Sequence, residues 1–166
     1  MQVLGIDPGT ATTGYGLVCE SESGGIQIVD YGIIATPKNT PPECRLLTIF
    51  ERTLELIALH SPDTAAVEKL FFQRNVTTAL AVGQARGVVL LALAKNKIPI
   101  FEYTPMEVKL AVAGYGGADK KQVQLMVKAI LKMNDIPRPD DAADALAIAI
   151  CHCQSYRLRQ LEERQL

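Results

Sequence analysis

The sequence predicts one α/β domain, built on a mixed five-stranded sheet with helices on both faces. Near the N-terminus, three apolar segments rich in β-branched residues follow one another with short turns, which indicates antiparallel hairpins. Two further apolar segments alternate with helical patterns, which indicates parallel strands in the middle of the sheet. With 166 residues, of which 48% are hydrophobic and 21% charged, the chain is long enough for one sizeable core.

The N-terminal half is expected to hold three hairpin-connected strands, a helix and a fourth strand. Two glycines at 24–25 supply the turn between the second and third strands. Apolar residues over 46–57 recur at helical spacing, and the segment SPD at 61–63 ends that helix. The expected strands are 2–7, 13–20, 26–35 and 64–68, and the expected helix is 42–59.

The C-terminal half is expected to contain one more strand and four helices. Because Pro137 and Pro139 end a linker, the last helix is expected to begin at Asp140 or Asp141. No linker divides the chain, so we expect one domain over 1–158 and a frayed polar tail over 159–166. The expected strand is 98–103, and the expected earlier helices are 76–96, 105–112 and 119–132.

Four carboxylates stand where predicted strands end or the last helix begins: Asp7, Glu68, Asp141 and Asp144. Asp7 ends the first strand and Glu68 the fourth, and the other two lie three residues apart on one helix face. If the strand ends meet at one edge of the sheet, these side chains converge and repel one another unless a cation lies among them. Hard divalent cations such as Mg²⁺ are the usual partners of clustered carboxylates. The pattern predicts a metal-dependent phosphoryl-transfer enzyme.

Each carboxylate also has a simpler explanation. Asp7 precedes Pro-Gly and could form a turn, and Asp140 or Asp141 could cap the last helix. However, an aspartate that ends an apolar central strand is costly unless it is paired or bound to a metal. A cap does not require a second aspartate, Asp144, on the same helix face. We therefore favour a shared site for all four carboxylates.

Composition limits the classes of partner. The net charge of −1, from 17 Lys and Arg against 18 Asp and Glu, argues against indiscriminate nucleic-acid binding. Cys151, His152 and Cys153 are consecutive in helical sequence and point about 100° apart, so they do not form a zinc site. No apolar run approaches the roughly 20 residues that span a bilayer. We expect a cytoplasmic protein that does not associate with membranes.

Aromatic and basic residues near the carboxylates are further candidates. Phe71 and Phe72 directly follow the fourth strand, and they could either pack in the core or stack on bases. Lys109, Lys120 and Lys121 flank a glycine-rich loop, an arrangement suited to phosphate contacts. For any one of these lysines, a solvated surface position is the simpler explanation.

The long helix of 76–96 carries Ala79, Gly83 and Gly87 at four-residue spacing, which gives it a smooth face. Such a face lets another backbone approach closely. The spacing fits either packing on the chain's own sheet or a homodimer contact, and periodicity does not distinguish the two.

Five motifs in this order resemble the RuvC-type Holliday-junction resolvases, which have an RNase H-like fold. The resemblance covers roughly residues 2–155. The N-terminal motif alone occurs in many RNase H-like proteins, whereas the five together are specific. The motifs are GIDPGTATTGYG, VEKLFFQRN, ALAVGQARG, EVKLAVAGYGGADKKQVQ and DAADALAIAI.

The resemblance implies a homodimeric endonuclease that resolves four-way DNA junctions by two symmetric nicks, leaving 5′-phosphate and 3′-hydroxyl ends. It also implies a role in recombination and DNA repair, with the RuvA–RuvB branch-migration complex as partner. For the helix that carries Gly83 and Gly87, it favours a homodimer contact over packing on the chain's own sheet. Carried over by motif, the metal ligands are Asp7, Glu68, Asp141 and Asp144, the aromatic contact to bases is Phe71, and the basic residues near the cut phosphate are Lys109 and Lys120. Phe72, Arg74 and Lys121 are further expected DNA contacts.

The expected chemistry is hydrolysis with two Mg²⁺ ions per site, for which Mn²⁺ should substitute. Asp7 is expected to bridge the ions, with Glu68 completing the ligands of one and Asp141 with Asp144 those of the other. His60 and His152 are assigned no role.

Three alternatives stay open at this point. An actin- or sugar-kinase-like ATPase shares the D-x-G pattern, but it needs a second lobe for which 166 residues leave no room. A shorter resolvase-like RNase H group linked to ribosomal RNA processing shares only the N-terminal motif. A module that holds junctions without cutting them would not need the four carboxylates.

Overall fold

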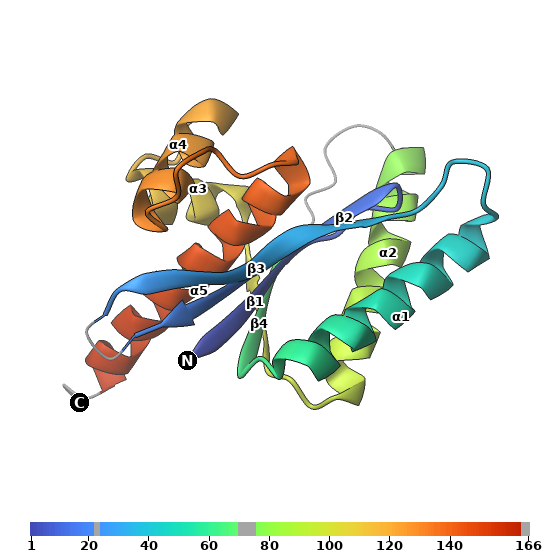
Figure 1. Cartoon of the computed structure of the whole chain (residues 1–166), viewed down its shortest axis with the longest axis horizontal. Coiled ribbons are helices and arrows are strands. Elements are labelled where there is room, and N and C mark those ends of the chain that lie inside the picture. The colour runs from blue at the N-terminus through green and yellow to red at the C-terminus, as the bar shows by residue number, and fades with distance from the viewer. Residues whose placement is uncertain (22–23, 70–75, 164–166) are drawn as a thin grey trace.

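The computed structural model describes residues 1–21, 24–69 and 76–163 of the chain (Figure 1). Its centre is a five-stranded sheet in the order β3-β2-β1-β4-β5. β1 pairs antiparallel with β2 and parallel with β4, which confirms the predicted mixed sheet. The strands are β1 (Gln2–Asp7), β2 (Thr12–Glu20), β3 (Ile26–Ala35), β4 (Thr64–Glu68) and β5 (Ile100–Tyr103).

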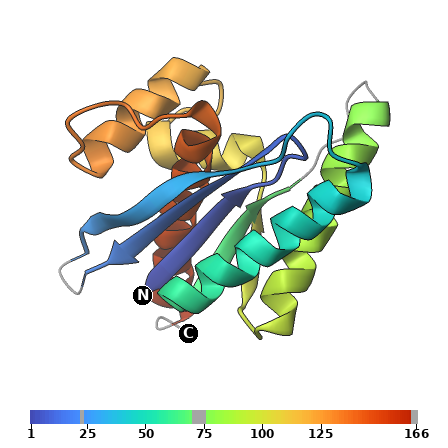
Figure 2. The same ribbon diagram turned by 45° about the vertical axis from the view of Figure 1, so that its right-hand side comes forward.

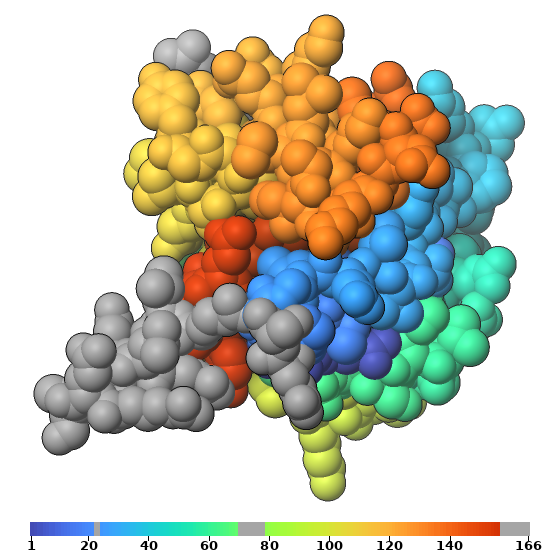
Figure 3. Space-filling model, turned by 60° about the vertical axis from the view of Figure 1, so that its left-hand side comes forward, coloured from blue at the N-terminus to red at the C-terminus, as the bar shows by residue number. Residues whose placement is uncertain are grey.

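Helices cover both faces of the sheet, as predicted (Figure 2). α1 and α2 pack on one face, and α5 crosses the other, where α3 and α4 pack against it. In the space-filling view little of α5 is visible between α4 and the blue strands (Figure 3). The helices are α1 (Pro42–His60), α2 (Val76–Lys95), α3 (Pro105–Ala113), α4 (Lys120–Ile130) and α5 (Asp140–Glu163).

The start of β5 and the end of α5 are among the element ends that differ from expectation. β5 begins at Ile100 rather than at 98, because the Ile98 N–H bonds back to the Leu93 carbonyl at the end of α2. α5 continues to Glu163, past residue 159, where the sequence predicts a polar tail. Within the described residues, no helix is long and apolar enough to cross a membrane.

Glycines allow α5 to lie directly on β1 and β2. A Cβ at Gly5 would overlap the Ala145 carbonyl oxygen, and a Cβ at Gly14 would overlap that of Asp141. At Gly16 it would lie 2.7 Å from the backbone nitrogen of Leu146. Real Cβ atoms do not approach so closely, so the glycines of the N-terminal motif set how near the last helix comes to the sheet.

Candidate active site

Asp7 lies at the end of the central strand β1, on the face covered by α5. Alternation along the strand places Val3, Gly5 and Asp7 on this face, and Val3 packs in the core beneath α5. Burial, followed by the negative charges of Glu68, Asp144 and Asp141, raises the pKa of Asp7 from 3.8 to about 7. Negative charge from several acidic side chains is therefore concentrated around a buried carboxylate.

Glu68 ends the neighbouring parallel strand β4 and faces the same way. Thr64 and Ala66 precede it on this face, and Ala66 belongs to the core under α5. Burial and the charge of Asp144 raise the pKa of Glu68 above its usual value. The parallel pairing of β1 with β4 thus brings two acidic strand ends to one edge, as predicted.

α5 supplies the other two carboxylates from its first turns. Asp144 accepts a 2.9 Å hydrogen bond from the Lys120 ammonium. Burial raises the pKa of Asp144, although the bond to Lys120 opposes this shift. Asp141 is half-buried, and its charge contributes to the raised pKa of Asp7. The structure therefore brings all four predicted carboxylates into one electrostatic cluster.

The first residue of α5, Asp140, has a separate role. Its carboxylate accepts a hydrogen bond from the Gln124 amide of α4 at 3.1 Å, and Arg138 lies at 3.5 Å. Lys120 lies 3.6 Å from its other oxygen. Asp140 thus ties the start of α5 to α4, and its charge also contributes to the raised pKa of Asp144.

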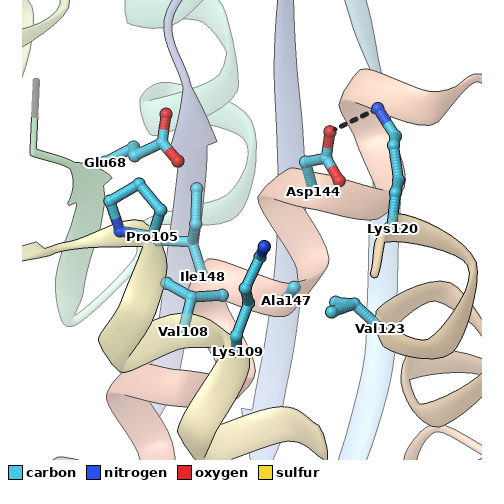
Figure 4. Close-up of a pocket in the computed structure, with 9 residues that line it drawn as sticks. All are labelled: Glu68, Pro105, Val108, Lys109, Lys120, Val123, Asp144, Ala147 and Ile148. Atoms are coloured by element: carbon cyan, nitrogen blue, oxygen red, sulfur yellow. Dashed lines mark hydrogen bonds and ion pairs between the residues drawn. The ribbon is translucent and has the colours of Figure 1, made fainter. Parts of the chain in front are cut away.

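A pocket beside the cluster joins two of the acids to two of the predicted lysines (Figure 4). Glu68 and Asp144 lie on opposite sides, and Lys109 of α3 extends between them while Lys120 reaches Asp144. Lys121 is exposed and is not among the described residues that line this pocket. Both lysine-bearing helices begin with a capping box, formed by Thr104 with Glu107 in α3 and by Asp119 with Gln122 in α4.

The donor set fits a hard divalent cation. All four acids offer oxygen ligands, and a carboxylate whose pKa is raised to about 7 by burial and like charge gains stability from a cation. Among the described residues, no group of three or more His, Cys, Asp or Glu side chains is already arranged to hold an ion.

Comparison with known proteins decides the family. The sequence model of the crossover junction endodeoxyribonuclease RuvC matches residues 3–152. The chain is 54% identical over 163 residues to a crossover junction endodeoxyribonuclease RuvC from Syntrophomonas wolfei, covering 98% of this chain and 94% of that one. This chain belongs to the RuvC family.

Solved RuvC structures share the fold described above. Thermus thermophilus RuvC superposes with a TM-score of 0.88 at 39% identity, covering 95% of this chain and 96% of that one. T. thermophilus RuvC in complex with Holliday junction substrate gives 0.87 at 37% identity, with the same coverage. The predicted RNase H-like α/β fold is thereby confirmed.

The remaining predicted site residues of this RuvC-family chain fall into two groups. Phe71, Phe72 and Arg74 lie outside the described residues. Gly83 and Gly87 lie on α2, where a Cβ at either would meet nothing within 4 Å. Within the described residues, then, the sheet does not cover this side of α2, which removes the alternative of packing on the chain's own sheet at the two glycines. Ala79 is half-buried on the same helix.

The sequence interpretation gave no role to Arg86, although it lies within the ALAVGQARG motif. Arg86 donates from Nε to the backbone carbonyl of Glu68 at 3.2 Å and forms an ion pair with Glu102. A sequence signal was available, because Arg86 is the only charged residue of α2 before Lys95.

Proposed function

We propose that this chain resolves four-way DNA junctions as a homodimeric, Mg²⁺-dependent endonuclease. The observation that carries the proposal is the cluster of Asp7, Glu68, Asp141 and Asp144 at one sheet edge, beside a lysine-lined pocket. Its support includes RuvC family membership, and a RuvC of similar fold has been solved with Holliday junction substrate.

The four carboxylates are the proposed ligands for two Mg²⁺ ions, with Mn²⁺ as a substitute. Bound divalent cations supply Lewis-acid activation of water and stabilise charge on the leaving oxygen in phosphodiester hydrolysis. Asp7 would hold the ions together with Glu68, Asp144 and Asp141, whose charges all raise its pKa. The product ends would be 5′-phosphate and 3′-hydroxyl.

The lysines of the pocket act on the DNA backbone. Lys109 lies between Glu68 and Asp144, where its ammonium can contact the phosphate that is cut (Figure 4). Lys120 is bonded to Asp144 and can offer its charge to phosphate once a cation replaces it there. The exposed Lys121 would contact the backbone outside the pocket, and Phe71, Phe72 and Arg74 stay proposed DNA contacts on the sequence alone.

The homodimer is proposed to form through α2. Leu80 and Leu91 of this helix are 65% and 60% exposed, and Gly83 and Gly87 lie between them on the open side. A helix that is apolar on its outer as well as its inner side is typical of one buried in a larger assembly. A two-fold dimer would present one site to each of two equivalent junction strands.

Location and further partners follow from the family resemblance. We propose a cytoplasmic protein that acts in recombination and repair alongside the RuvA–RuvB branch-migration complex. Selection of the junction over duplex is proposed to come from DNA shape, since few groups in the pocket could read base edges.

The test is nicking of a synthetic mobile four-way junction in Mg²⁺, with linear duplex as substrate control and Asp7→Asn as enzyme control. The expected result is paired symmetric nicks in the junction, none in the duplex, and none by the variant, which should still bind the junction. Binding without cutting by the wild type in both Mg²⁺ and Mn²⁺ would instead establish a junction-binding module. Absence of binding would direct attention to RNA.

A further inference from the structure

The end of β4 that carries Glu68 pairs with a neighbouring strand on one side alone within the described residues. The pairing of β1 with β4 ends at Ile6 and Val67, so within the described residues Glu68 has a strand partner only in Tyr103 of β5. The next ladder bond runs from the Lys69 N–H to the Tyr103 carbonyl at 2.8 Å. Within the described residues, strand pairing therefore fixes the backbone that carries the Glu68 carboxylate on the β5 side alone.

Arg86 supplies a contact from the opposite face of the sheet. It extends from α2, its Nε donates to the Glu68 carbonyl, and its terminal nitrogen pairs with Glu102 on β5. The Arg86 side chain is 18% exposed and that of Glu102 is 41% exposed, so the pair is partly shielded from water. One guanidinium thus joins α2 to the ends of both β4 and β5.

We propose that Arg86 is a positioning residue that fixes the end of β4 and thereby holds the Glu68 carboxylate in place for the cation. The proposal rests on the proposed function, in which Glu68 is a metal ligand. Arginine is required because Nε and a terminal nitrogen donate in two fixed directions, toward the carbonyl and toward Glu102. A lysine keeps the charge but cannot make both contacts in this geometry.

The experiment uses the full chain and two independent readouts. Amide hydrogen exchange of Lys69 is measured without metal, and Mn²⁺ binding is measured by calorimetry, for Arg86→Met and Arg86→Lys. Glu102→Gln is a milder, isosteric variant that tests the same contact if the others unfold. The matched control is Arg52→Met, because Arg52 also pairs with a glutamate but is 62% exposed on α1.

We expect Lys69 to exchange about tenfold faster, and Mn²⁺ affinity to fall about tenfold or more, in both Arg86 variants, as is typical when a group that orients a ligand is lost. Amides of β1 and β2, together with the Arg52→Met protein, should be unchanged. Lys69 exchange and Mn²⁺ affinity within about twofold of wild type, while Glu68→Gln loses Mn²⁺, would overturn the positioning role. If Glu68→Gln binds Mn²⁺ as the wild type does, the proposed function fails, and Lys69 exchange still reports on the Arg86 contact.

Discussion

Replacing Asp7 with asparagine should stabilise the cation-free protein while abolishing nicking. Burial and neighbouring carboxylates in the folded protein raise the pKa of Asp7 from 3.8 to about 7. At about 1.36 kcal/mol per unit, the ionised side chain costs the fold about 4 kcal/mol. Because folding raises the pKa of Asp7, the folded protein favours the protonated side chain. This contribution to the free energy of unfolding is present below the pKa of 3.8 in the unfolded chain, and it is lost as the pH rises through the folded-state pKa of about 7.

The assay is urea unfolding in EDTA at about pH 4 and about pH 8, on either side of the titration. Asp7→Asn should be up to about 4 kcal/mol more stable than wild type at the higher pH and little different at the lower one. The matched control is Asp135→Asn, at an exposed position between α4 and α5, which should not show this difference. Added Mg²⁺ should stabilise the wild type and not the Asp7 variant. An equal gain at both pH values, or no gain at the higher one, would contradict the electrostatic account of the site.

Three other substitutions test the surrounding structure. Gly14→Ala inserts a Cβ where the α5 backbone lies, so we expect a loss of stability of about 1–3 kcal/mol or more by urea unfolding, and an unchanged midpoint would contradict the close contact. Lys120→Met removes the cation that lowers the pKa of Asp144, so the acid limb of the nicking rate against pH should move to higher pH. Lys121→Met is its control and should leave that limb in place. Leu91→Glu on the open side of α2 should yield monomers in analytical ultracentrifugation, and an unchanged dimer would place the interface elsewhere.

The strands could be predicted from sequence because their signals are local. Alternation and turn residues gave the bounds of β1, β3 and β4 directly. The start of β5 could not be predicted in this way, because it depends on a backbone bond from Ile98 to the end of α2. The extent of α5 was underestimated, since polar composition alone does not end a helix.

The convergence of the acids was predictable, whereas their supporting contacts were not. Asp7 and Glu68 each end a strand, and parallel neighbours necessarily bring such ends to one edge. The sequence left open whether Asp140 or Asp141 begins the last helix, and it does not reveal the contact of Asp140 with Gln124 of α4. The same limit applies to Arg86, whose partners on β4 and β5 are known only once α2 is placed.

The packing of α5 on β1 and β2 assembles the site. The same packing makes the ionised site costly in free energy of folding when no cation is bound. Glycines at 5, 14 and 16 let α5 pack directly against β1 and β2, which brings Asp144 toward the strand ends. The same approach removes water from Asp7, and burial is the largest cause of its raised pKa. A substitution that moves α5 away from the sheet should therefore lower both the pKa of Asp7 and the affinity of the site for a cation. At Asp7 itself, stability without metal and affinity for metal are opposed, so a substitution that removes its charge is expected to gain the first at the expense of the second.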